Sequence, residues 1–182
     1  MSYRDLKSYQ MATIIYDFTV EFCNLYIRSY SRTRDQMEQA ARSGKQNIVE
    51  ASNQRTSSKI ELKLLGIARG SLQELLEDYE DFLRQRSLGQ WPRDSAQARA
   101  VRELAYKSNR SYKTYRTYLG SPEGTANCAI CLINQTNYLL DHQIKSLEEK
   151  FVKSGGWTEQ IRKKREQYTK KIMRTPLHKW WA

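Results

Sequence analysis

The sequence predicts an all-α protein without a sheet. Over most of the chain, apolar residues recur at alternating spacings of three and four, which is the spacing of one helix face. No segment of useful length alternates apolar and polar residues as a half-buried strand does. Only 8 Gly and 3 Pro occur among 182 residues. Few positions therefore favour turns, and long helices are expected.

The first two predicted helices carry different apolar stripes. A helix over residues 6–30 has large residues on its apolar face, namely Met11, Ile15, Phe18, Phe22 and Leu25. After the polar break SRTRD, a helix over residues 35–53 has a narrow stripe of Met37, Ala41, Gly44, Ile48 and Ala51. Small residues let two helix axes approach closely, so we expect this second helix to pack tightly against a neighbour.

The third predicted helix, over residues 59–86, has two apolar stripes side by side. Ser57 and Ser58 precede it as candidate N-caps, and Glu61 has the capping-box spacing from Ser58. The first stripe holds Leu62, Leu65, Leu72, Leu76, Tyr79 and Leu83, and the second holds Ile60, Leu64, Ile67, Leu75 and Phe82. A helix at the rim of a bundle needs one stripe. The second stripe therefore predicts burial against another segment of the chain or another subunit.

Three further helices are expected in the second half of the chain. A loop with Gly89 and Pro92 precedes a helix over residues 96–119, whose face holds Ala98, Val101, Ala105, Tyr112, Tyr115 and Leu119. After the break GSPEG, a helix over residues 126–152 has the most regular heptad: Ala126, Ile130, Ile133, Asn137, Leu140, Ile144, Leu147 and Phe151. Its lone polar member, Asn137, is predicted to fix the helix register. A last helix covers residues 158–173.

These elements divide into two predicted units, a helical bundle at 1–152 and a basic helical suffix and tail at 153–182. No run approaches the roughly 18 apolar residues of a membrane span. The start MSYRDLKSYQ lacks the layout of a signal peptide. A cytoplasmic location without a membrane partner is therefore predicted.

The cysteines and histidines predict neither a metal site nor a cofactor. Cys128 and Cys131 are spaced as CxxC, but the sequence has no second pair at zinc-finger spacing. All three cysteines, including Cys23, are interpreted as small core residues. His142 and His178 stand too far apart for a ligand cluster. The sequence also has no phosphate-binding loop, zinc-protease or hydrolase motif.

The strongest charge lies near the C-terminal end. The formal net charge is +11, and residues 153–182 contribute +7 of it, with nine basic residues against two acidic ones. The candidate nucleic-acid-binding residues there are Arg162, Lys163, Lys164, Arg165, Lys170, Lys171 and Arg174. Dense cations attract phosphate backbones, and the interleaved Trp157, Tyr168, Trp180 and Trp181 offer stacking surfaces for bases. The alternatives are a solvated basic tail and a membrane-surface helix with Trp anchors.

A second basic group surrounds the first two breaks, and its members are Arg28, Arg32, Arg34, Arg42, Lys45, Arg55, Lys59 and Lys63. Arg55, Lys59 and Lys63 are spaced by four, so they form one ridge if the segment is helical. We expect this ridge to be the main nucleic-acid site and the suffix to add non-specific affinity. The alternative for any single residue is an ordinary charged outer face.

Residues 108–118, SNRSYKTYRTY, interleave three tyrosines with Arg110, Lys113 and Arg116. This pattern is typical of a stacking platform for single-stranded nucleic acid. However, two of the tyrosines, at positions 112 and 115, also fall on the apolar stripe. We therefore expect those two to pack on the bundle and Tyr118 to be exposed.

The acidic residues do not predict catalysis. Five of them crowd the end of the third helix, Glu74, Glu77, Asp78, Glu80 and Asp81. The Glu-x-x-His pair of di-iron bundles is absent from the sequence. We interpret the cluster as a solvated face, which a subunit contact could pair with basic neighbours. The prediction is a protein that is not an enzyme and has no small-molecule substrate.

The segment from Ala40 to Leu83 resembles a known family. The matching features are Ala40–Ala41, Asn47–Ile48–Val49–Glu50–Ala51, Arg55, Ser57–Ser58, and Gly70–Ser71–Leu72 with Glu74. They resemble the four-helix-bundle family found in 23S rRNA intervening sequences and the accessory variability proteins of diversity-generating retroelements, in a long form with a C-terminal suffix. Val49 and Ala51 depart from the family pattern, which has Ala and Gly there. The likeness extends loosely to the helix at 126–152.

The resemblance implies an antiparallel up-down four-helix bundle with the helix at 96–119 inserted. It also implies a ring of subunits, often a pentamer, with a basic surface, no enzymatic activity, and a role in assisting a reverse transcriptase. With the charge, it leads us to predict a nucleic-acid-binding, ring-forming accessory protein whose partners are RNA or DNA. Two alternatives stay open: a protein-docking module without direct nucleic-acid binding, and a nuclease with an unrecognised site.

Overall fold

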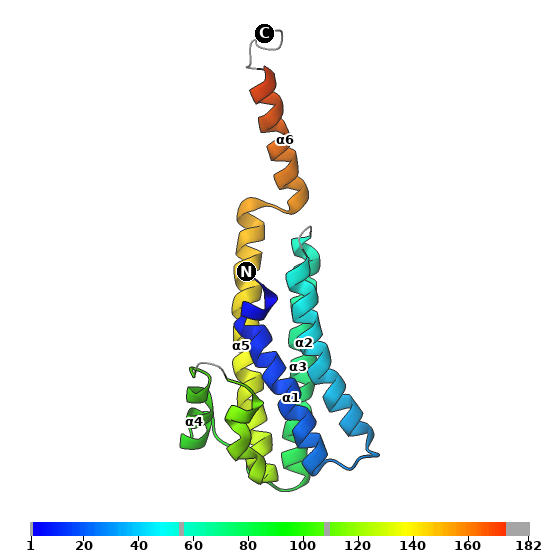
Figure 1. The fold of residues 1–182 in the computed structure, drawn as a ribbon, viewed down its shortest axis with the longest axis vertical. Coiled ribbons are helices and arrows are strands. Elements are labelled where there is room, and N and C mark those ends of the chain that lie inside the picture. Colours follow the sequence, from blue (N-terminus) through cyan, green and yellow to red (C-terminus); the bar gives the residue numbers. More distant parts are fainter. Residues whose placement is uncertain (1, 55–56, 108–109, 174–182) are drawn as a thin grey trace.

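The computed structural model describes residues 2–54, 57–107 and 110–173, and the regular structure in these ranges is entirely helical. This confirms the predicted all-α class. The chain runs through η1 (Tyr3–Asp5), α1 (Lys7–Tyr26), α2 (Arg32–Asn53), α3 (Ser58–Gln85), α4 (Ala96–Leu104), η2 (Tyr112–Gly120), α5 (Pro122–Ser154) and α6 (Trp157–Met173), where η marks a 3₁₀-helix. The long helices α1, α2, α3 and α5 alternate in direction along the chain (Figure 1).

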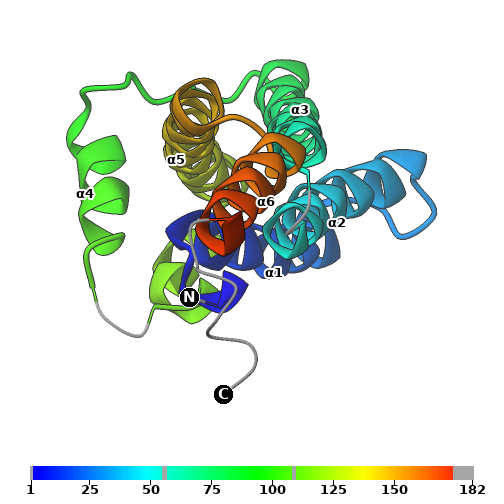
Figure 2. The same cartoon turned by 90° about the horizontal axis from the view of Figure 1, so that it is seen from above.

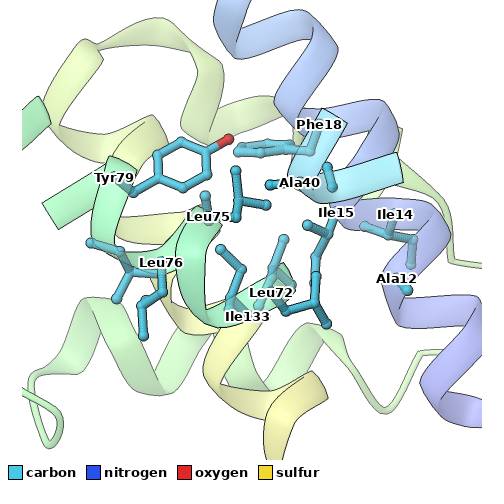
Figure 3. Close-up of a cluster of buried hydrophobic side chains, with 14 of the residues drawn as sticks. Ala12, Ile14, Ile15, Phe18, Ala40, Leu72, Leu75, Leu76, Tyr79 and Ile133 are labelled. Atoms are coloured by element: carbon cyan, nitrogen blue, oxygen red, sulfur yellow. The ribbon is translucent and has the colours of Figure 1, made fainter. Parts of the chain in front are cut away.

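These four long helices surround one hydrophobic core. Helix α2 packs against α1 and α3, and α5 packs against the same two helices. Seen from above, α1 and α3 therefore lie diagonally opposite each other (Figure 2). Phe18 of α1, Leu72 of α3 and Ile133 of α5 meet in this core and are fully buried (Figure 3). One face of α3 thus points away from the core.

A buried polar pair crosses the core between α1 and α3. The Tyr79 hydroxyl donates a hydrogen bond of 3.0 Å to Thr19 Oγ1, and both side chains are fully buried. Burial raises the pKa of Tyr79 well above its ordinary value, and the bond to Thr19 opposes this only in part. The hydroxyl therefore stays protonated as a hydrogen-bond donor.

The small residues of α2 allow the close approach that the sequence predicts. A Cβ on Gly44 would lie 2.9 Å from Cγ and Cδ2 of Leu72 on α3, which is closer than carbon atoms pack. Ala41, Ile48 and Ala51 on the same stripe are buried as well. The stripe therefore sets the distance between α2 and α3.

Serine side chains cap α2, α3, α4 and α5, and two of these caps shift predicted boundaries. Ser31 Oγ accepts from the Thr33 N–H at 3.3 Å, so α2 begins inside the segment predicted as a break. Ser121 Oγ accepts from the Gly124 N–H at 3.0 Å, and α5 therefore begins at Pro122 within the predicted GSPEG break. Helix α3 is capped by Ser57 rather than by a box of Ser58 and Glu61. Pro122 is compatible with the first position of α5 because no backbone N–H is needed there.

The predicted continuous helix over residues 96–119 is wrong. Helix α4 ends at Leu104, and the chain restarts at a new cap, where Ser111 and Thr114 bond each other's backbone N–H groups. The following residues form the 3₁₀-helix η2. Thr and Tyr, which fill this segment, have modest α-helix propensity. The predicted helix over 6–30 also ends early, because Ile27 adopts an extended conformation.

The double stripe of α3 is buried in its C-terminal half and partly exposed in its N-terminal half. Leu75 and Phe82 of the second stripe are buried within the chain. In contrast, Ile60 and Ile67 are 47% and 43% exposed. Within the described residues, the chain therefore buries both stripes of α3 only in the C-terminal half of the helix.

The heptad of α5 is likewise buried at one end. Its members from Ala126 to Leu140 lie in the core, whereas Phe151 is 38% exposed. Asn137 is 6% exposed, and its Oδ1 has no hydrogen-bond partner among the described residues. Cys23 and Cys128 are buried as predicted, and Cys131 is half-buried. Burial raises the pKa of Cys23 to about 12, so its thiol stays protonated at neutral pH.

Candidate nucleic-acid interface

Helix α6 extends past the end of the four long helices (Figure 1). Gly155 ends α5 with a φ of 72°, a left-handed conformation that favours glycine. The Gly156 N–H then donates to the Glu159 carboxylate. The sequence pair Gly155–Gly156 therefore creates the break after which α6 projects from the core.

The described cations of the suffix are exposed on α6: Arg162, Lys163, Lys164, Arg165, Lys170 and Lys171. Only two acidic residues, Glu159 and Glu166, belong to this helix. Arg162 forms an ion pair with Glu166 at 3.7 Å between side chains that are mostly exposed. Such a pair is worth at most about 1 kcal/mol, so α6 keeps a strong positive field.

Aromatic and apolar side chains are exposed between these cations. Trp157 is 47% exposed and Tyr168 is 67% exposed. Trp180, Trp181 and Arg174, which the sequence also predicts to contribute, lie outside the described residues. Within α6, aromatic rings and cations thus stand on one solvent-exposed helix, as base stacking beside phosphate contacts requires.

The second basic group does not gather on one surface. Arg28 lies in the turn between α1 and α2, at the opposite end of the core from α6 (Figure 1). Arg32 and Arg42 are exposed on α2. Arg34 donates to Asn24 Oδ1 at 2.6 Å and pairs with Glu38 at 3.0 Å. These cations are therefore spread over the α1–α2 end and the length of α2.

Lys45 has a structural contact of its own. Its Nζ stands 4.2 Å from the centre of the Tyr16 ring on α1, which is a cation–π distance. The same ammonium lowers the pKa of Asp17, which burial raises more strongly. Lys45 is half-buried, so part of its charge serves the α1–α2 packing.

The predicted ridge is seen only in part. Lys59 and Lys63 are exposed on the side of α3 that points away from the core, and Arg55 lies outside the described residues. Further along the same side, α3 exposes Glu74 and Glu77. The field over this helix therefore changes sign along its length, unlike that of α6.

The tyrosine-rich segment forms no exposed platform among its described residues. Tyr115 is fully buried, as expected. The predicted exposure of Tyr118 is wrong: this residue is half-buried, with its ring 6.1 Å from that of Trp91. Trp91, in the loop before α4, packs against it, and the periodicity of residues 96–119 does not reveal this contact.

The acidic cluster lies beside a shallow groove between α2 and α3. Two pockets there share Gln36 and Asp78 as lining residues. Burial raises the pKa of Asp78, and the nearby Asp81 and Glu74 raise it further. Among the described residues, no group of three or more His, Cys, Asp or Glu side chains is placed to hold a metal ion.

Exposed aromatic residues outside α6 were missed at the sequence level. Tyr138 is 64% exposed on α5, and its ring lies 4.3 Å from that of His142 in an edge-on arrangement. Tyr106 is 89% exposed after α4. The spacing of four between Tyr138 and His142 places them on one helix face. This spacing is the sequence signal from which the pair could have been predicted.

Comparisons with family models, curated proteins and solved structures found no match to this chain. Within the ranges that the structure describes, no helix combines the length and the apolar character needed to cross a membrane.

Proposed function

We propose that this protein binds nucleic acid through α6 and acts as a non-enzymatic accessory protein. One observation carries the proposal: a helix that projects from the core exposes six cations against two acidic residues, together with Trp157 and Tyr168. Cations on several sides of a narrow helix suit a polyanion, because the successive phosphates of a nucleic-acid strand can contact more than one side of that helix. Binding of this kind depends on charge and stacking rather than on base sequence.

The structure supports α6 as the main site more strongly than the ridge on α3. The side of α3 that holds Lys59 and Lys63 also holds Glu74 and Glu77, and carboxylates repel phosphate. Arg34 and Lys45 of the second basic group are engaged with Glu38 and Tyr16. We therefore place the principal phosphate contacts on α6 and assign a weaker contribution to the second group.

The test is charge reversal in the full chain. Changing Arg162, Lys163, Lys164 and Arg165 to Glu should weaken binding to structured RNA and to single-stranded DNA by roughly tenfold or more at 50 mM salt. The slope of log affinity against log salt should also flatten, by about 0.7 to 0.9 for each phosphate that the variant no longer neutralises. Fluorescence anisotropy at several salt concentrations measures both quantities.

A matched control reverses four exposed cations elsewhere: Arg93, Arg99, Lys107 and Lys113. This control changes the net charge equally, so it should leave most of the affinity if α6 is the site. An equal fall in affinity for both variants would reduce the effect to net charge alone. Full-strength binding by the α6 variant would refute the proposal.

The wider role stays a prediction. The family resemblance implies that RNA or DNA binding assists a reverse transcriptase and that the subunits form a ring of five. Co-purification of a reverse transcriptase tests the first point, and native mass spectrometry tests the second. A partner that binds with little salt dependence and without nucleic acid would instead favour the protein-docking alternative.

A further inference from the structure

The side of α3 that points away from the core has no neighbouring helix within the described part of the chain. Helix α3 packs against α2 on one side and α5 on the other (Figure 2). Its exposed side follows the helical spacing of four and three through Lys59, Lys63, Gly66, Gly70, Glu74 and Glu77. We call these six residues the outer face of α3.

Two glycines in the middle of the outer face have no packing role among the described residues. A Cβ on Gly66 or Gly70 would meet nothing within 4 Å beyond its own helix, in contrast to Gly44. Each mid-helix glycine costs about 1 kcal/mol relative to alanine. Glycine at such a place lets the backbone of a second helix come close.

Apolar surface lies beside the glycines. Ile67, between Gly66 and Gly70 in sequence, is 43% exposed, and Ile60 is 47% exposed one to two turns earlier. Both belong to the part of the second apolar stripe that the described residues leave uncovered. A partner on the outer face would therefore bury aliphatic side chains as well as meet backbone.

The charges of the outer face are ordered along the helix. Lys59 and Lys63 lie before the glycines, and Glu74 and Glu77 lie after them. Lys59 stands in the first turn of α3, where the helix dipole disfavours a cation. Lys63, Glu74 and Glu77 lie outside the first and last turns, where the helix dipole has little effect. An order of two cations before two carboxylates is complementary to a partner face with the reversed order.

A second copy of the same face, turned antiparallel, has that reversed order. When the two helices cross midway between Gly66 and Gly70, Lys59 of one copy lies as far from the crossing point as Glu77 of the other. Lys63 similarly approaches Glu74 of the other copy. A shallow crossing of about 20° keeps long side chains within reach at both ends.

We propose that two copies of this protein form a two-fold dimer through the outer face of α3. The contact is the same patch on both copies, so it closes after two chains. It is an alternative to the head-to-tail contact of the five-membered ring that the family resemblance implies, and it does not depend on nucleic-acid binding. The dimer places the two α6 helices at opposite ends, because the two α3 helices run in opposite directions.

Charge reversal at the ends of the outer face tests the proposal. Light scattering or sedimentation velocity on nucleic-acid-free full-length protein should give twice the 21.5 kDa chain mass. Lys59→Glu and Glu77→Lys each place like charges opposite each other, so each should weaken the dimer by roughly tenfold or more. Arg99→Glu on α4 is the control for a changed net charge and should dimerise as the wild type does.

Mixing the two single variants gives the sharpest outcome. In a mixed dimer, the carboxylate introduced by Lys59→Glu in one chain would face the ammonium introduced by Glu77→Lys in the other. At the second end, the unchanged Glu77 of the first chain would face the unchanged Lys59 of the second. Both pairs are attractive, so the mixture should regain the wild-type affinity although each variant alone dimerises weakly. A contact in which position 59 of one copy faces position 77 of the other predicts this recovery, and a particle of two chains shows that the contact is two-fold.

A steric variant keeps the proposal testable if the charges contribute little. Gly66→Leu with Gly70→Leu improves helix propensity but blocks close approach, so helix content by circular dichroism should persist while the dimer dissociates. A monomeric wild type at micromolar concentration would overturn the proposal. So would a dimer that neither the charge variants nor the leucine variant changes, and so would a particle of five chains, which would support the ring instead.

Discussion

Asn137 is the residue whose predicted role can be tested most directly. Its side chain lies in the core, and Oδ1 has no partner among the described residues. Leaving a buried acceptor without a hydrogen bond costs about 1–3 kcal/mol. Asn137→Leu should therefore raise the free energy of unfolding by about that amount, as measured by chemical denaturation. Asn134→Leu, at an exposed position of the same helix, should change it little.

The predicted register role of Asn137 has a second consequence, which can be tested separately from stability. If the polar residue selects one arrangement of subunits, as buried Asn does in coiled coils, Asn137→Leu should give more than one stoichiometry in native mass spectra. A more stable variant with unchanged stoichiometry would leave Asn137 as a polar residue that the core tolerates.

Residue roles were predictable from sequence where spacing alone decides them. The small stripe of α2 predicted close packing, and Gly44 against Leu72 shows it. The burial of Tyr118 was not predictable, because Trp91 covers it from a loop that no periodicity places. Contacts across long sequence separations need the topology, and spacing along one helix does not contain it.

At the scale of elements, one asparagine holds the loop between α3 and α4 against α5. Asn127 is buried; its Nδ2 donates to the Gly89 carbonyl at 2.8 Å, and its Oδ1 accepts from the Trp91 N–H at 2.7 Å. Asn127→Ala leaves both backbone groups without this partner, which should cost about 1–3 kcal/mol. Hydrogen exchange should accelerate at the Trp91 amide.

The comparison residue for this prediction is Asn134 on the same helix. Its Nδ2 donates to the carbonyl one turn back, at Ile130, with a length of 3.0 Å. Asn134→Ala should therefore change stability and exchange in the loop very little. Equal effects at both positions would show that the removal of any Asn on α5 matters, rather than the anchoring of the loop.

The long helices were predictable because each has an apolar stripe, and most have a serine cap near their start. Their ends were less accurate, since Ser31 and Ser121 begin helices inside polar segments that look like breaks. The segment 96–119 failed for a different reason. Its apolar spacing fits an α-helix, but the reciprocal cap of Ser111 and Thr114 starts a separate 3₁₀ element. Periodicity does not distinguish one long helix from two short elements in phase.

At the scale of the whole molecule, two groups of basic residues that the sequence analysis treats alike lie on surfaces of different charge. The cations of α6 stand on a projecting helix, whereas Lys59 and Lys63 share the outer face of α3 with Glu74 and Glu77. A count of basic residues along the sequence treats all of these cations as phosphate ligands. Their placement favours binding of a polyanion by α6 and self-association by α3.

The two proposals together predict that the wild-type protein connects two nucleic-acid molecules. In the dimer, the two α6 helices lie at opposite ends, too far apart for one short oligonucleotide to contact both. Beads that carry one biotinylated oligonucleotide should therefore retain a second, fluorescent one when wild-type protein is present. Lys59→Glu should still bind each oligonucleotide, because α6 is intact, but should retain far less of the second. Mixing Lys59→Glu with Glu77→Lys should restore retention. Undiminished retention by Lys59→Glu alone, at a concentration where it is monomeric, would mean that one chain holds two nucleic-acid sites and would contradict this arrangement.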